Sequence, residues 1–145
     1  MKNNKAFTLI ELIVIIVILG VIMVFALPNI TSTLERNKKD KMIIDAKDMV
    51  EKARNYISAG KASYPTTTPV KLMLKDIDSR GEIKDSPFGY SYDRDNSSVT
   101  VTLDSGIYKY SVCLDDDHYR LKTVDDFSEL NKDDKYTKIT EDSCS

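Results

Sequence analysis

Hydrophobic positions are concentrated near the beginning of the chain. The sixteen residues from Leu12 to Leu27 carry no polar side chain. The apolar run extends back to Ala6, interrupted only by Thr8 and Glu11. As an α-helix the whole run would be about 33 Å long, which matches a hydrocarbon core of about 30 Å. The pattern therefore predicts a membrane-embedded helix.

A second helical pattern follows the apolar run. Its apolar side chains recur seven residues apart on one face of a helix; they are Met42, Ile43, Ala46, Met49, Val50, Ala53, Tyr56 and Ile57. Gly60 is a typical helix stop. We expect one helix from about residue 7 to residue 59, apolar all round in its first half and amphipathic in its second. Gly20 and Pro28 are poor helix formers, and a kink is expected there.

After Gly89 the spacing of apolar residues changes to two. Residues 98–103 alternate, residues 107–114 return after a turn, and residues 119–124 follow a second turn. This alternation is typical of antiparallel strands joined by short turns. We expect a three-stranded meander, with residues 90–92 as a candidate fourth strand. One face of the sheet would cover the apolar stripe of the helix, which makes the fold class α+β.

The connection between helix and sheet, residues 60–88, is irregular and contains several prolines. Within it, residues 70–77 are expected to form a short helix with Leu74 and Ile77 on one face. An ordinary surface linker is the alternative for the rest of this segment.

Composition narrows the class of protein. A chain of 145 residues is long enough for one domain. Hydrophobic residues make up 41%, but their concentration in one run excludes both an ordinary soluble globule and a polytopic membrane protein. The net charge is −2, so the basic excess of a phosphate-binding domain is missing and no direct nucleic-acid binding is expected.

The sequence offers little catalytic or metal-binding chemistry. His118 is the single histidine, and it belongs to no Ser-His-Asp or Cys-His pattern. We therefore expect no enzyme, no cofactor and no small-molecule substrate. Asp115, Asp116 and Asp117 are consecutive, whereas calcium loops alternate their ligands around a glycine turn. A solvated acidic turn is expected, with no metal.

The two cysteines, Cys113 and Cys144, both lie in the C-terminal third of the chain. In an exported protein such an even pair is typical of a disulfide. Two buried free thiols are the alternative.

Three interpretations compete for the N-terminal segment. A secretory signal peptide would use Val24-Phe25-Ala26 as its cleavage site, but the apolar run is long for one and contains Glu11. A plain membrane anchor explains the length of the run but not the carboxylate, because an acid within a membrane span is costly.

The third interpretation accounts for the details. Residues 5–12, Lys-Ala-Phe-Thr-Leu-Ile-Glu-Leu, resemble the type IV prepilin signature, in which a short basic leader precedes a Phe-Thr-Leu-Ile-Glu start. Gly20 and Pro28 also match that family. The resemblance covers residues 1–34 and implies that a prepilin peptidase cuts between Ala6 and Phe7 and methylates the new amino terminus of Phe7. The family usually has Gly at the position of Ala6; since Ala is the smallest replacement, cleavage is expected to survive.

This resemblance implies a structural subunit of an extracellular type IV pilus filament that polymerises through its N-terminal helix, in surface attachment, motility or biofilm formation. One alternative is a pseudopilin of type II secretion or of competence DNA uptake. Another is a membrane-anchored extracellular binding domain that never polymerises. Glu11 argues against that last alternative, because in a filament it would face the new amine of a neighbouring subunit, whereas an anchor has no use for it.

The expected organisation is a leader (1–6), a transmembrane and assembly half of the helix (7–28), an amphipathic half (29–60) and a globular head (61–145). The head would contain the linking loop, the sheet and a disulfide-closed C-terminal region. Expected partners are other pilin subunits, the prepilin peptidase and, before assembly, the cytoplasmic membrane. The basic residues near position 38 outnumber those of the leader, which alone favours the opposite orientation. The signature outweighs that count, so the head is expected outside the cell.

Overall fold

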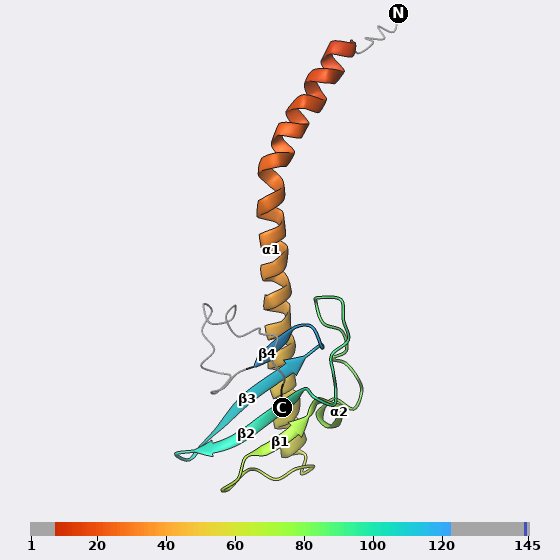
Figure 1. Ribbon diagram of the computed structural model, residues 1–145. Helices are drawn as coiled ribbons and strands as arrows, with labels where there is room; N and C mark the ends of the chain where they lie inside the picture. Colours follow the sequence, from red (N-terminus) through yellow and green to blue (C-terminus); the bar gives the residue numbers. More distant parts are fainter. Residues whose placement is uncertain (1–7, 123–143, 145) are drawn as a thin grey trace, which may run out of the picture. The chain divides into compact units, whose positions relative to one another are not determined.

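The computed structural model describes residues 8–122 and 144, with residues 26–29 described by their backbone alone. Along the chain, the elements are helix α1 (Leu9–Ser58), strand β1 (Val70–Met73), helix α2 (Leu74–Ile77) and strands β2 (Ser98–Asp104), β3 (Ile107–Asp115) and β4 (Arg120–Lys122). The strands form one antiparallel sheet in the order β1-β2-β3-β4 (Figure 1). A long N-terminal helix followed by an antiparallel sheet confirms the expected α+β class.

The chain forms two compact units, Met1–Arg36 and Asn37–Ser145. From here on we call them the stem and the head, so that the head includes part of α1 as well as the predicted head residues 61–145. Helix α1 contributes to both units. The stem contains its apolar part, and the head contains its amphipathic part together with all four strands.

Helix α1 ends at the glycine that the sequence singles out. The backbone N–H of Gly60 donates to the carbonyl of Ile57 at 2.9 Å, and that of Lys61 donates to the carbonyl of Tyr56 at 3.2 Å. These two bonds form the Schellman motif, which satisfies carbonyls that a helix end leaves open. Gly60 has a φ of 72°, a left-handed conformation that a side chain disfavours.

The core of the head lies between α1 and one face of the sheet. The helix contributes the predicted stripe, of which Tyr56 is only partly buried against the core. The other members are at most 5% exposed: Met42, Ile43, Ala46, Met49, Val50, Ala53 and Ile57. The strands contribute side chains that lie opposite one another across the sheet and share one face; these are Leu72, Val99 and Val112, then Val70, Val101 and Tyr110, then Leu114 and Leu121.

The fourth strand lies elsewhere than the sequence suggests. The predicted short helix over residues 70–77 is half wrong, since residues 70–73 form strand β1 and only Leu74–Ile77 are helical. Pairing with β2 decides this, because it places Val70 opposite Val101 and Leu72 opposite Val99. The candidate strand at residues 90–92 makes only an isolated bridge, from Ser91 to Asp85.

The helix stripe generates a stability prediction. We expect Met49→Ala to lower the free energy of unfolding by about 2–5 kcal/mol, because it leaves a cavity at a fully buried position. Ile44→Ala, five residues earlier on the same helix and 56% exposed, is the control and should change it by less than about 0.5 kcal/mol. Urea unfolding of the full chain in detergent, followed by tyrosine fluorescence, measures both. Equal effects would contradict the burial pattern.

Candidate functional site

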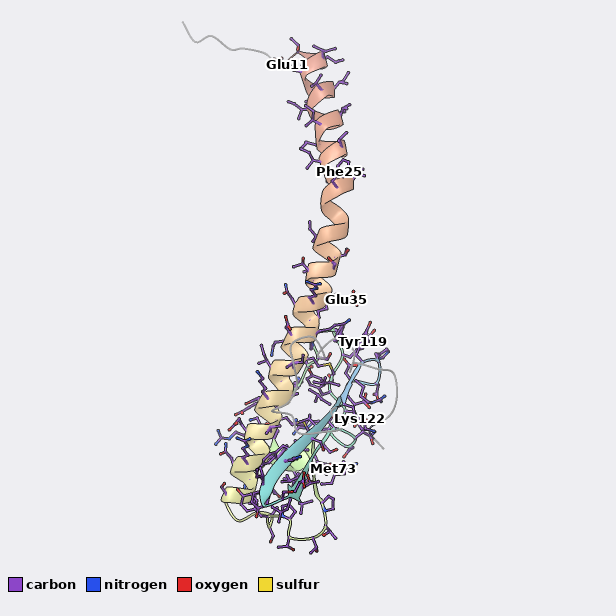
Figure 2. The ribbon with its side chains drawn as sticks, turned by 90° about the vertical axis from the view of Figure 1, so that its left-hand side faces the viewer. Glu11, Phe25, Glu35, Met73, Tyr119 and Lys122 are labelled. Atoms are coloured by element: carbon purple, nitrogen blue, oxygen red, sulfur yellow. A yellow bond between two sulfur atoms is a disulfide. The ribbon has the colours of Figure 1, made fainter. Side chains whose placement is uncertain are left out.

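The stem presents apolar side chains in every direction. The large apolar residues from Leu9 to Phe25 are each between 43% and 77% exposed in the single chain. Figure 2 labels Glu11 and Phe25, between which these side chains radiate from the helix. A helix that is hydrophobic all round is stable when lipid or other helices cover it. The stem is therefore built to be covered by something outside the single chain.

Glu11 lies in the first turn of α1, where it forms a capping box with Thr8. The Thr8 backbone N–H donates to Glu11 Oε2 at 3.0 Å, and the Thr8 hydroxyl donates to the same oxygen at 2.9 Å. In return, the Glu11 backbone N–H donates to Thr8 Oγ1 at 3.3 Å. A carboxylate is also favoured by the positive end of the helix dipole. The sequence-based prediction did not include this capping box, although Thr-x-x-Glu at the start of a helix is the pattern that indicates one.

Of the other residues that the sequence singles out in the stem, the structure describes Gly20 and the backbone of Pro28. The predicted cleavage and methylation positions, Ala6 and Phe7, lie outside the described residues. Gly20 and Pro28 both lie within helix α1, and a kink at them stays a prediction. No atom beyond the helix backbone comes within 4 Å of where a Gly20 Cβ would stand.

The acidic turn between β3 and β4 differs from expectation. The sequence predicts a solvated turn, but Asp115 is only 2% and Asp116 only 1% exposed, and of the three aspartates Asp117 alone is exposed. Asp115 accepts hydrogen bonds from Arg120, with Nε at 2.8 Å from Oδ2. Asp116 Oδ1 accepts the backbone N–H of His118 at 3.0 Å and that of Tyr119 at 2.6 Å. The two buried carboxylates therefore stabilise the turn through these hydrogen bonds. In the sequence, the cation Arg120, five residues after Asp115, is the feature that could have predicted the burial of Asp115.

A second polar network holds the connection between α2 and β2. Asp78, at 2% exposure, accepts the backbone N–H groups of Glu82 (3.2 Å) and Ile83 (3.0 Å). Its carboxylate also lies 3.1 Å from Arg94 Nη1 and 3.3 Å from Lys52 Nζ. Burial by itself raises the pKa of Asp78, but these donors outweigh it and hold the pKa below its usual value. Because Lys52 belongs to α1, the network fastens the connection to the helix.

Tyr92 makes a further link to α1. Its buried hydroxyl donates to Asp45 Oδ2 at 2.9 Å. Burial, and then the neighbouring Asp45 carboxylate, raise the pKa of Tyr92 far above its usual value. The tyrosine therefore stays neutral and keeps donating to the helix.

The structure joins Cys113 on β3 to Cys144 by a disulfide, the pair named from the sequence. Both residues are less than 9% exposed. The bond closes a loop with a sequence separation of 31, which the chain-entropy model values at roughly 3–4 kcal/mol. Residue 144 is thus tied to the middle of the sheet.

Among residues 8–122 and 144, no group of three or more His, Cys, Asp or Glu side chains is arranged to hold a metal ion. His118 lies exposed in the β3–β4 turn. Of the described segments, none is by itself long and apolar enough to cross a membrane; Leu9–Phe25 and Ile30–Ser58 meet that requirement only when taken together.

A known family motif matches the beginning of this chain. The family model described as the prokaryotic N-terminal methylation motif matches residues 1–27. Such a motif implies a precursor anchored in the membrane by its N-terminus. It agrees with the type IV prepilin resemblance of residues 1–34.

Two curated relatives are named type II secretion system core protein G. The one from Klebsiella pneumoniae is 34% identical over 67 residues, which is 46% of this chain and 47% of the relative. The one from Vibrio cholerae serotype O1 is 33% identical over 67 residues, or 46% of this chain and 45% of the relative. The chain therefore matches about half the length of these relatives. No solved structure gives a significant match.

The Asp78 network generates a pH prediction. Because the pKa of Asp78 is lowered in the folded state, its ionised form adds stability above the ordinary value of 3.8, and this is lost as the pH falls through the folded-state pKa. Asp78→Asn should cost about 3 kcal/mol at pH 7, since Arg94 and Lys52 lose their buried counter-charge. It should also flatten the acid limb of a plot of melting temperature against pH.

The matched control is Asp76→Asn, which removes an exposed carboxylate from α2 and should leave the curve unchanged. An Asp78→Asn protein with the wild-type acid limb would show that the network contributes nothing to pH-dependent stability.

Proposed function

We propose that this chain, a type IV pilin-like protein by its methylation motif and its α+β fold, is a structural subunit that polymerises through its stem into a filament. The observation that carries the proposal is the stem itself. It combines the peptidase and methylation signature with a helix that is apolar in every direction and has a single carboxylate in its first turn.

The finer assignment follows the relatives. The sequence first suggests an extracellular pilus with a secretion pseudopilin as alternative, but both named relatives are core proteins of type II secretion systems. We therefore place the pseudopilin ahead of the pilus subunit. The pilus subunit remains as second candidate because the resemblance to type IV pilins associates a C-terminal cysteine pair, here the Cys113–Cys144 disulfide, with the pilus class.

The proposed role is structural rather than catalytic, with no cofactor. Its partners are the prepilin peptidase, the cytoplasmic membrane before assembly, and other subunits of the same kind afterwards. The head lies outside the membrane and remains exposed on the assembled filament.

Assembly would rest on charge pairing in an apolar setting. Once the leader is removed, Phe7 carries a new positive amine four residues before Glu11. Burying either charge alone costs several kcal/mol, and an opposite charge within reach recovers much of that cost. The Glu11 carboxylate of an incoming subunit would therefore pair with the amine of a subunit already in place, which sets the register of the stems.

Processing gives a direct prediction. Protein isolated from assembled filaments should begin at Phe7 with a methylated amine, because the signature implies cleavage after Ala6. Intact-mass and N-terminal peptide mass spectrometry measure this. An intact leader on assembled protein, or a start after Ala26, would overturn the assignment.

Glu11 gives a second prediction. Glu11→Gln and Glu11→Ala should still be inserted and cleaved, but should enter filaments roughly tenfold less well than wild type, a factor that corresponds to about 1.4 kcal/mol. Competition between tagged wild-type and variant chains in one cell, followed by shearing and blotting of filaments, measures it. Glu35→Gln, the same change elsewhere on α1, is the control and should assemble normally. If the Glu11 variants enter filaments as well as wild type, the hypothesis that the N-terminal segment is a plain membrane anchor is favoured.

The neighbouring genes separate the two filament classes. A secretion operon around the gene supports the pseudopilin, whereas an assembly ATPase accompanied by a retraction ATPase supports the pilus subunit.

A further inference from the structure

Three consecutive threonines stand between two prolines in the connection from α1 to β1. The sequence there is Pro65-Thr66-Thr67-Thr68-Pro69. The three threonines and the second proline are exposed, whereas the first proline is buried. Figure 1 shows the connection as an open loop between the end of α1 and the start of β1. The threonines therefore lie on the surface of the head.

The hydroxyls of this segment have no structural task within the single chain. Among the described residues, none of the three threonine side chains has a hydrogen-bond partner. Their backbone groups also make no hydrogen bond to another backbone group there. The segment thus presents three unused hydroxyls on a stretch of chain that is not tied into the sheet.

The residue types of the segment favour an extended backbone. Proline fixes its own φ and disfavours a helical conformation in the residue before it, and the β-branched side chain of threonine also favours extended chain. The structure assigns neither helix nor strand to residues 66–68. An extended and accessible segment is one that an enzyme can bind in a groove. Segments rich in Ser or Thr together with Pro are typical carriers of O-linked sugars.

An aromatic pair that the single chain leaves uncovered lies beside the segment. Tyr64, two residues before Thr66, packs on Tyr108 of β3 with ring centroids 4.6 Å apart. Tyr64 is 40% exposed, Tyr108 is 38% exposed, and Leu103, which faces Tyr108 across the β2–β3 hairpin, is 40% exposed. Two residues of extended chain span at most about 7 Å. A group attached to the Thr66 hydroxyl is therefore within reach of these side chains.

This apolar surface distinguishes between the groups that a hydroxyl can carry. One face of a hexose ring consists mainly of C–H groups, which pack against the electron-rich face of an aromatic ring while the sugar hydroxyls stay in water. A phosphate on the same oxygen would instead bring about two negative charges to the negative faces of the tyrosine rings. The uncovered aromatic pair therefore favours a sugar over a phosphate.

We infer that the head is an acceptor of O-linked glycosylation at Thr66, Thr67 and Thr68. The donor is a sugar esterified through its anomeric carbon to a phosphate or diphosphate carrier. A transferase joins threonine Oγ1 to that carbon, the bond from the carbon to the phosphate oxygen breaks, and the phosphate leaves with the electron pair. The hydroxyl proton passes to a base of the transferase. This inference goes beyond the proposed function, because a subunit can polymerise with or without a sugar on its head.

The test is mass spectrometry of the full chain purified from the cells that naturally produce it. Trypsin cuts after Lys61 and Lys71, so one peptide, residues 62–71, contains all three threonines. In most copies this peptide should be heavier than its sequence by a whole number of sugar residues. Fragmentation that leaves side-chain groups attached should place the sugar within residues 66–68.

Two variants show which hydroxyls accept the sugar. Thr66→Ala, Thr67→Ala and Thr68→Ala combined should remove the added mass completely. Leader cleavage and the native disulfide should be retained, because the three hydroxyls make no hydrogen bond in the fold. Ser63→Ala is the matched control, since it removes another exposed hydroxyl from the same peptide, and it should keep the added mass.

An unmodified peptide from the wild-type chain would overturn the inference, and so would an added phosphate in place of a sugar. A sugar on Ser63, or only elsewhere in the chain, such as on Asn96 in the sequence Asn-Ser-Ser, would overturn it too. Filaments built from chains without a sugar would leave the proposed function standing. Glycosylated chains that never enter filaments would contradict the proposed function alone.

Discussion

Packing of the α1 stripe against the inner face of the sheet is the contact on which the rest of the head depends. Ala46 and Ala53 are fully buried in the middle of that stripe. The inner faces of β1, β2 and β3 supply apolar side chains in register across the sheet, and the helix covers them until the last pair of the β2–β3 hairpin. The exposed tip of the hairpin is thus a consequence of where α1 ends, at the Schellman motif around Gly60.

Outside that core, the loops of the head are held by buried polar groups rather than by apolar contacts. Asp78 gathers two backbone N–H groups and two cations around one carboxylate, Tyr92 donates to Asp45 on the helix, and Asp116 holds the turn before β4. Each of these groups would be costly to bury without its partners. They therefore fix the long connections in one arrangement, which a small apolar core would not do alone.

Both units expose apolar side chains that the single chain leaves uncovered. The stem exposes apolar side chains all round, and the head exposes aromatic and aliphatic side chains at both ends of β3. Lipid can cover the stem of a single chain, and the stems of further copies can cover it in a filament. A subunit whose stem is uncovered in this way is suited to polymerise.

The sequence by itself determined the elements whose pattern is local. The apolar run, the stripe from Met42 to Ile57, the stop at Gly60 and the β2–β3 hairpin are all readable because each depends on spacing along one element. Only the tertiary structure decided the rest. Val70–Met73 became a strand because β2 offered it partners. Asp115 and Asp116 became buried because Arg120 and the backbone of the turn neutralise and hydrogen-bond them. Strand pairing and the burial of charge depend on partners distant in the sequence or supplied by the folded backbone, and no local pattern of apolar and polar residues records where those partners will lie.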